Sequence, residues 1–151
     1  MRVRYMVVSE PFFEPKYSHE GDGAADIFCA EAVEFAPFER KLIKTGIAIE
    51  IPDGFAGFIL PRSGLALKRG LTVVNAPGLV DSGYRGELKI ALVNLSPNGY
   101  DKIEVGDRVA QLLIMPIPAV TFEKSAELSP SKRANAGFGS TGVNGPARLQ
   151  Y

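Results

Sequence analysis

The sequence predicts an all-β domain, a jelly roll or β-barrel of short strands. Turn-forming residues are abundant, with 16 Gly and 11 Pro in 151 residues, and they interrupt the chain roughly every 8–12 residues, which is the spacing of strands and turns in all-β domains. The segments between them are short and rich in β-branched or alternating apolar residues, whereas helical periodicity is nearly absent. A barrel or jelly roll lets such short strands share one core.

Each expected strand lies between two turn signals. Residues 2–9 alternate along the chain, and residues 41–51 are β-branched and end at a Pro-Asp-Gly turn. Further strands are expected at residues 55–60, 71–74, 86–94, 108–116 and 120–123. Residues 63–67 fit a single helical turn.

The chain is expected to divide into a β domain and a tail. With 46% hydrophobic residues, residues 1–128 contain enough apolar side chains for one core. Residues 129–151 contain three basic residues, no acid and several glycines. We expect this Gly-rich segment to be a flexible C-terminal tail that closes over a ligand, with a disordered chain end as the alternative.

Charge and cysteine content exclude several function classes. The 17 basic and 17 acidic residues balance, which argues against a nucleic-acid polymer or an anionic membrane surface as the main partner. Cys29 is the single cysteine, so no intrachain disulfide forms and a reducing, cytoplasmic location is expected. It lies in an apolar run, which predicts a buried, unreactive thiol. With His19 as the single histidine, a zinc site and a Cys/His catalytic pair are not expected.

Several segments carry groups suited to a small anionic ligand. Ser63 is a good N-cap for the short helix, where free N–H groups attract anions, and Arg62 adds a charge. The alternative is a plain cap beside a surface arginine. Asp26 opens an apolar run and fits either a Mg²⁺ site reached through water or a turn cap.

Residues 75–86 are rich in turn formers but contain Leu79 and Val80, which predicts a tight hairpin with a packed interior. Within it, Asp81 fits a general base that orients a water, and Tyr84 fits packing against a sugar. The alternative is that Asp81 caps a turn and Tyr84 belongs to the core.

Arg108 and Gln111 raise a question of geometry. Their odd spacing places them on opposite faces of a regular strand, so they serve one site only if a bulge intervenes or if the two faces meet different partners. In the tail, residues 133–142 combine backbone N–H groups, two hydroxyls, Arg133 and Phe138. These groups suit a polyphosphate and a flat base.

Five segments in this order resemble the trimeric all-β dUTPase family, the deoxyuridine 5′-triphosphate nucleotidohydrolases. They are residues 24–27, 61–66, 78–87, 106–112 and 133–142. The resemblance implies a jelly-roll homotrimer with three active sites, each built from all three chains. It also implies hydrolysis of dUTP to dUMP and pyrophosphate with Mg²⁺, which keeps uracil out of DNA and supplies dUMP for thymidylate synthesis.

The resemblance assigns roles to individual residues. Asp81 would deprotonate the water that attacks the α-phosphorus, and Asp26 would reach the metal through water. Uracil and deoxyribose would be held by Asn75, Gly78, Tyr84, Lys89 and Phe138, with Tyr84 excluding a 2′-hydroxyl and Phe138 stacking on the base. The phosphates would be held by Arg62, Ser63, Gly64, Gln111, Arg133, Gly139, Ser140 and Thr141.

The chain departs from the family pattern in three places. Ala134 and Ala136 stand where the tail commonly has glycines, and Ala25 stands where a bulky residue is common. Two other functions remain open. A dCTP deaminase shares the fold, but its catalytic glutamate would fall at Ala91. A nucleotide-sensing trimer would bind dUTP without hydrolysis.

Overall fold

A computed structural model describes residues 1–131 of the chain. The chain divides into two compact units, Met1–Ala119 and Val120–Tyr151. All named strands and the helix lie in the first unit. The predicted boundary between residues 128 and 129 therefore lies inside the second unit, and the proposed closure of the tail stays a prediction.

The first sheet has four antiparallel strands in the order β1-β4-β8-β6. They are β1 (Arg4–Val7), β4 (Arg40–Glu50), β8 (Glu87–Asn94) and β6 (Leu71–Val73). Strand β8 shows why these residues form a sheet. Leu88, Ile90 and Leu92 are buried, while the residues between them are more exposed, as the two-residue period of a strand requires.

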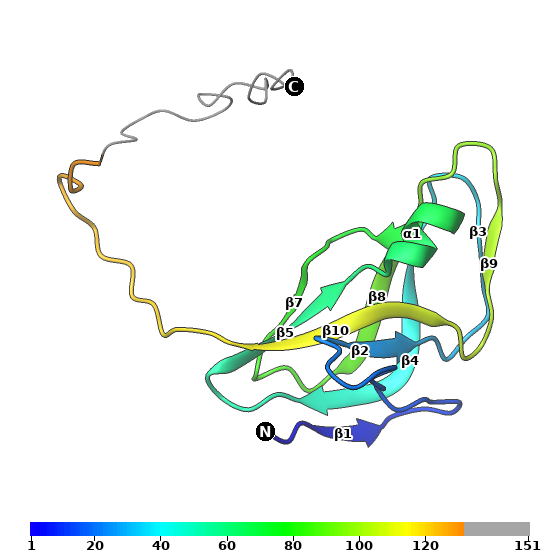
Figure 1. The fold of residues 1–151 in the computed structure, drawn as a ribbon, viewed down its shortest axis with the longest axis horizontal. Helices are drawn as coiled ribbons and strands as arrows, with labels where there is room; N and C mark the ends of the chain where they lie inside the picture. Colours follow the sequence, from blue (N-terminus) through cyan, green and yellow to red (C-terminus); the bar gives the residue numbers. More distant parts are fainter. Residues whose placement is uncertain (132–151) are drawn as a thin grey trace, which may run out of the picture. The chain divides into compact units, whose positions relative to one another are not determined.

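The second sheet also has four antiparallel strands, in the order β2-β10-β5-β7. They are β2 (Ala25–Phe28), β10 (Arg108–Pro116), β5 (Phe55–Leu60) and β7 (Gly78–Val80). Strands β3 (Val33–Phe35) and β9 (Asp101–Ile103) form a separate two-stranded ribbon. The helix, α1, spans Ser63–Arg69. Figure 1 shows α1 at the same end of the first unit as the β3–β9 ribbon.

One hydrophobic core contains side chains from both sheets and the ribbon. Its largest fully buried members include Phe35, Ile27, Ile43, Ile90 and Leu92. Cys29 is also fully buried, as predicted. Burial raises the pKa of its thiol, which keeps it protonated and unreactive. The predicted all-β fold is confirmed.

The predicted elements differ from the observed ones in three respects. The predicted strands at residues 55–60 and 108–116 have the same first and last residues as β5 and β10. The sequence did not predict β2, β3 and β9, because three or four residues are too few to show a period. The helix has two turns rather than one. The prediction of a strand at residues 120–123 is wrong. Val120 is 63% and Phe122 96% exposed, and within the described chain no strand edge pairs with this segment.

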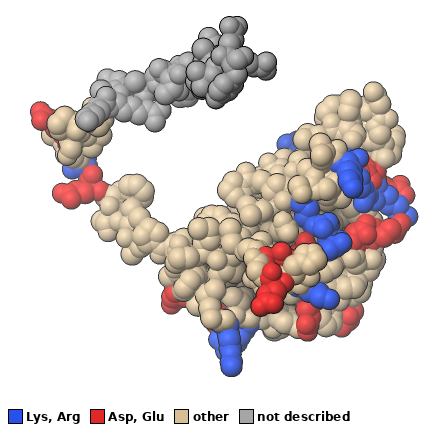
Figure 2. All heavy atoms as spheres, viewed as in Figure 1, with Lys and Arg blue, Asp and Glu red and all other residues tan. Residues whose placement is uncertain are grey.

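The surface of the first unit carries mixed charge. Figure 2 shows basic and acidic side chains interspersed on the face it draws, in keeping with the balanced composition. Within residues 1–131, no helix is long and apolar enough to cross a membrane.

Candidate active site

Asp26 is the centre of the first of two pockets. Its carboxylate is 3% exposed and accepts hydrogen bonds on both oxygens. Ser18 Oγ donates to Oδ2 at 2.9 Å, and Arg62 Nε donates to Oδ1 at 3.1 Å. Arg108 Nη1 and Gln111 Nε2 lie 3.4 Å from Oδ2 and Oδ1, respectively. This buried acid is therefore held by four side chains from distant parts of the sequence.

The sheet order explains this convergence. Strand β10 lies between β2 and β5, so Gln111 lies opposite Asp26 on one side and opposite Leu60 on the other. Arg62 lies two residues after Leu60, and its side chain donates a hydrogen bond to the Asp26 carboxylate. Antiparallel pairing thus brings three separate sequence motifs to one point.

A β-bulge answers the question raised by Arg108 and Gln111. The register between β10 and β2 shifts between Arg108 and Ala110, and such an extra residue re-aims the side chains on the bulged strand. Arg108 and Gln111 consequently reach the same carboxylate of Asp26. Of the alternatives that the sequence left open, the structure has the bulge.

The charges in this pocket keep Asp26 ionised. Burial raises the pKa of its carboxyl, but the hydrogen bond from Ser18 and the charges of Arg62 and Arg108 outweigh that effect, so the pKa is lowered overall. The pocket has a volume of about 520 Å³, and its lining also includes His19 and Asp22. With two arginines against one buried carboxylate, it suits an anionic ligand.

The short helix begins differently from the prediction. The N-cap is Arg62, in extended backbone conformation and without a side-chain capping bond, so the prediction of Ser63 as N-cap is wrong. The Arg62 carbonyl accepts the first helical hydrogen bond from Ala66 N at 2.9 Å. Ser63 and Gly64 form the exposed first turn. The cap shifts because the Arg62 guanidinium is anchored to Asp26, which fixes the backbone just before the helix.

Asp81 lies in the second pocket, which has a volume of about 430 Å³ and is also lined by Tyr84, Lys89 and apolar side chains that include Leu79. The Asp81 carboxylate is exposed, and among residues 1–131 it has no hydrogen-bond or ion-pair partner. Its main-chain carbonyl accepts a hydrogen bond from Tyr84 N at 3.1 Å, which closes a turn. This carboxylate is thus available to a water or a ligand.

Tyr84 is held against the start of β8. Its hydroxyl donates to the Glu87 carbonyl at 2.8 Å, and a Cβ at Gly86 would lie only 2.6 Å from that hydroxyl. Gly86 therefore makes the room that the tyrosine occupies. Tyr84 is 45% exposed, so the alternative that it is a core residue is wrong. Lys89 Nζ lies 3.6 Å from Glu87 Oε2.

The predicted hairpin at residues 75–86 is only partly correct. Strand β7 pairs with β5, and Gly78 lies opposite Ile59. Val80 is buried, but Leu79 is 61% exposed, so the interior of the segment is not packed on both sides. Pairing with β5 sends alternate residues to opposite faces. Asn75 lies beside Gly78, where an added Cβ would come within 3.1 Å of its amide nitrogen.

Apart from Asn75 and Gly78, which line neither pocket, the predicted site residues fall into three groups. Asp26, Arg62 and Gln111 line the first pocket, and Ser63 and Gly64 follow Arg62 in the chain. Asp81, Tyr84 and Lys89 line the second pocket, and the two linings share no residue. The tail residues lie outside the described part of the chain; they are Arg133, Phe138, Gly139, Ser140 and Thr141. Sequence reasoning missed Ser18, because a lone serine in a polar loop gives no signal.

Of the oxygen ligands that a magnesium ion prefers, the first pocket supplies the carboxylates of Asp22 and Asp26. Asp26 is an ionised hard oxygen ligand. Among residues 1–131, however, no three His, Cys, Asp or Glu side chains gather where they could hold a metal. The two arginines also compete for the carboxylate. Phosphate oxygens would have to complete the coordination.

The chain matches known proteins over most of its length. The dUTPase family model matches residues 11–142. A deoxyuridine 5′-triphosphate nucleotidohydrolase from Thermobifida fusca is 56% identical over 128 residues, which are 85% of this chain and 72% of the relative. The enzyme of the same name from Cutibacterium acnes is 44% identical over 137 residues, or 91% and 90% of the two chains.

Solved structures agree with the sequence matches. A mutant of the Staphylococcus bacteriophage 80alpha dUTPase with dUpNHpp has a TM-score of 0.88 and 31% identity, covering 94% of this chain and 99% of the other. The dUTPase of phage phi11 of S. aureus, in a mutant described as coordinating a structural Mg(II) ion, has a TM-score of 0.80 and 29% identity, covering 86% and 100%. With both pockets inside the matched residues, this chain belongs to the dUTPase family.

Proposed function

We propose that this protein hydrolyses dUTP to dUMP and pyrophosphate. The observation that carries the proposal is the family match over residues 11–142, which includes both pockets. The relatives described above are named as deoxyuridine 5′-triphosphate nucleotidohydrolases.

Asp81 is the proposed general base. It accepts a proton from a water, whose oxygen forms a bond to the α-phosphorus while the bond from that phosphorus to the bridging oxygen breaks. Pyrophosphate leaves with the electron pair of the broken bond. The Asp81 carboxylate is exposed within the second pocket and has no partner in residues 1–131, which supports this role. A carboxylate that was already paired with a cation would be less available to accept a proton from the water.

The first pocket is the proposed site for the phosphates. Arg62, Gln111 and the first turn at Ser63 and Gly64 supply positive charge and hydrogen-bond donors, helped by Arg133, Gly139, Ser140 and Thr141 of the tail. A bound Mg²⁺ would neutralise phosphate charge that otherwise repels the attacking water. Asp26 would hold this ion through water. Its lowered pKa keeps it anionic for that purpose.

The second pocket is the proposed site for uracil and deoxyribose. Tyr84 would lie under the sugar and exclude a 2′-hydroxyl, and its tether to the Glu87 carbonyl supports a fixed ring position. Asn75, Gly78 and Lys89 complete this site, and Phe138 stacks on the base when the tail closes. A site that matches the hydrogen-bond pattern of uracil rejects cytosine strongly, because unmatched buried polar groups are costly.

A homotrimer with shared active sites is the proposed assembly. Within one chain the two pockets have no lining residue in common, which supports a site assembled from more than one subunit. The apolar side chains of Val120 and Phe122 are exposed, and a neighbouring subunit would cover them.

A cytoplasmic location is also part of the proposal, on the strength of the single, buried Cys29. There the enzyme would keep uracil out of DNA and supply dUMP for thymidylate synthesis.

A product assay tests the reaction. The protein with Mg²⁺ is offered dUTP, dCTP, dTTP and UTP in parallel, and nucleotide and pyrophosphate are resolved. We expect conversion of dUTP alone to dUMP and pyrophosphate. Deamination of dCTP would contradict the proposal. Ala91 argues against that outcome, because it lies in β8 opposite Leu42 and carries no proton-transferring group. Binding of dUTP without turnover would instead indicate a sensor.

A mixing experiment tests the shared site. A form that ends before Lys132 and an Asp81→Asn form should each have little activity, and mixed trimers of the two should recover part of it. Absence of recovery in confirmed mixed trimers would show that each chain builds its own site.

A further inference from the structure

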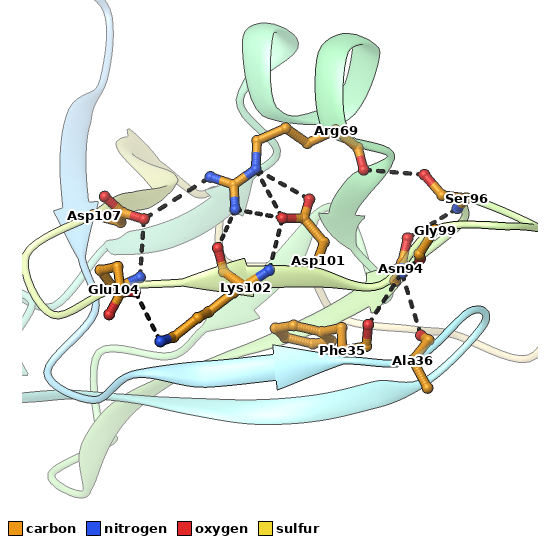
Figure 3. Close-up of polar contacts among 10 residues, drawn as sticks. All are labelled: Phe35, Ala36, Arg69, Asn94, Ser96, Gly99, Asp101, Lys102, Glu104 and Asp107. Atoms are coloured by element: carbon orange, nitrogen blue, oxygen red, sulfur yellow. Dashed lines mark hydrogen bonds and ion pairs between the residues drawn. The ribbon is translucent and has the colours of Figure 1, made fainter.

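Arg69, the last residue of α1, makes a dense set of polar contacts away from both pockets (Figure 3). Its Nε lies 3.1 and 3.0 Å from the two carboxylate oxygens of Asp101, and its Nη2 donates to Asp101 Oδ1 at 2.6 Å. Nη2 also donates to the Lys102 carbonyl. Nη1 lies 3.9 Å from Asp107 Oδ2. One guanidinium thus binds β9 and the turn that precedes β10.

The other end of α1 is bound to the same stretch of chain. Arg62, the N-cap, donates from Nη1 to the Arg108 carbonyl at 3.2 Å. Asp107 and Arg108 are consecutive, so the two ends of the helix are tied to neighbouring residues. Because Arg62 and Arg108 both bind Asp26, the position of α1 relative to this turn sets the geometry of the first pocket.

The hydrophobic core alone orients α1 weakly. Leu65 is the single buried residue of the helix, and one apolar anchor leaves rotation about that point unopposed. A bidentate Arg–carboxylate pair fixes direction as well as distance. The Arg69 side chain is 35% and that of Asp101 18% exposed, so the pair is partly shielded from solvent.

The backbone at Arg69 is also held. Its carbonyl accepts a hydrogen bond from Ser96 Oγ at 3.1 Å, and Ser96 N donates to Asn94 Oδ1 at 2.9 Å. Asn94 is fully buried, and its amide donates to the carbonyls of Ala36 and Gly99 at 3.2 and 2.8 Å. Figure 3 shows these groups on the opposite side of Arg69 from Asp107. The carboxyl end of the helix is therefore anchored to the core through a buried amide.

We propose that Arg69 is a positioning residue for triphosphate binding. By binding Asp101, Lys102 and Asp107, it holds α1 so that Arg62 faces the same pocket as Arg108. Arg69 itself does not touch the substrate. This inference rests on the proposed function of the first pocket as the phosphate site.

The proposal separates binding of the β- and γ-phosphates from binding of dUMP, whose single phosphate would lie beside Asp81 of the second pocket. Loss of the Arg69 guanidinium would let α1 tilt about its carboxyl end, which Ser96 still holds through the main-chain carbonyl. The tilt would move Arg62 away from Arg108 and weaken the grip on the β- and γ-phosphates. The second pocket contains no residue of α1, so the affinity for dUMP would not change. A purely stabilising ion pair would lower the unfolding temperature and leave the ratio of these affinities unchanged.

The test measures the dissociation constants of dUMP and of a non-hydrolysable imido analogue of dUTP with Mg²⁺, together with KM, kcat and Tm. The variants are Arg69→Gln and Asp107→Asn, and Lys68→Gln is the control, because Lys68 is an exposed neighbour on the same helix. Asp107→Asn removes the longest of the Arg69 contacts and preserves a side-chain oxygen for Glu104 N. If Arg69→Gln does not fold, the same measurements on Asp107→Asn test the proposal.

For Arg69→Gln we expect the affinity for the triphosphate analogue to fall about 10- to 100-fold, since misplacement of a binding group by about 1 Å has effects of this size. The affinity for dUMP should stay within about twofold, KM should rise with kcat little changed, and Lys68→Gln should behave as the unaltered protein. Asp107→Asn should change in the same direction by a smaller factor.

Equal losses for both nucleotides, or a lower Tm with an unchanged affinity ratio, would overturn the positioning role. An Arg62→Gln variant separates this failure from failure of the proposed function. If Arg62→Gln weakens binding of the analogue and Arg69→Gln does not, only the positioning role is wrong. If Arg62→Gln has no effect, the first pocket is not the phosphate site and both proposals fail.

Discussion

The first and the second pocket hold their carboxylates in opposite ways. Asp26 is buried, lies in the edge strand β2 opposite Gln111 of β10, and has both oxygens engaged by protein donors. Asp81 is exposed, follows the three-residue strand β7 and has no side-chain partner within residues 1–131. The first arrangement fixes charges in place before a ligand arrives, whereas the second leaves a carboxylate available for proton transfer.

With the proposed roles of Asp26 and Asp81, one fold would separate positioning from reactivity. Cross-strand pairing fixes Gln111 opposite Asp26 by register, so the donors of the first pocket would need little reorganisation when phosphates bind. A proton acceptor needs free lone pairs, which a loop end at the surface provides more readily than a paired strand interior. Variants that alter each carboxylate should therefore fail in different ways.

The largest expected effect is that of Asp81→Asn. An amide cannot accept the proton of the attacking water, so we expect kcat to fall about 10²- to 10⁴-fold, the usual contribution of a general base. Binding of a non-hydrolysable dUTP analogue should change little, because the side chain keeps its size. Single-turnover kinetics and calorimetric titration measure the two quantities. Near-normal turnover would remove Asp81 from the role of base.

Asp26→Asn should act on stability and phosphate binding together. The amide loses the charge that attracts Arg62 and Arg108, whose side chains are 25% and 47% exposed. Because solvent screens these arginines, we expect the free energy of unfolding to fall by only about 1–2 kcal/mol at neutral pH. Urea denaturation measures this difference, and a parallel titration should show weaker binding of the triphosphate.

The pH dependence of that difference has a definite sign. The pKa of Asp26 is lowered in the folded state, so its contribution is fully present above the unfolded pKa of about 3.9. The contribution is lost as pH falls through the lower folded pKa. The stability gap between the unaltered protein and Asp26→Asn should therefore be constant at neutral pH and close in acid. A gap that widens in acid would contradict this assignment.

Gly86→Ala tests the position of Tyr84 in the second pocket. Its new methyl group would collide with the Tyr84 hydroxyl, so the ring should shift and the preference of kcat/KM for dUTP over UTP should drop by about tenfold, or 1.4 kcal/mol. Gly83→Ala is the matched control, because a Cβ there has no neighbour within 4 Å. Equal selectivity in the two variants would show that Tyr84 does not sense the 2′-position.

The smallest expected effect is that of Ser18→Ala in the first pocket. It removes one hydrogen bond to Asp26, which should cost about 0.5–1.5 kcal/mol of stability and raise the pKa of Asp26. Thermal unfolding of this variant is compared with Ser125→Ala, whose hydroxyl lies in the second unit and, among residues 1–131, contacts Glu127. No difference between the two would mean that the hydrogen bond from Ser18 contributes nothing to the stability of the fold.

The sequence by itself determined the fold class, and it predicts a chemistry for the motifs. The all-β architecture followed from the turn spacing and the apolar runs, and strands such as β5 and β10 were located at both ends. The residue types at Asp81 and Arg62 indicated a base and a phosphate ligand. These features are local, since a strand or a turn reflects the preferences of adjacent residues.

Only the tertiary structure decided which motifs meet. Sheet order placed Gln111 opposite Asp26, and a bulge that no local pattern revealed turned Arg108 to the same carboxylate. The same anchor made Arg62 the helix cap in place of Ser63. Residues 120–123 have a strand-like sequence but form no strand, because a strand needs a partner edge. Pairing between distant segments depends on register and on the shared core, and neither can be deduced from neighbouring residues alone.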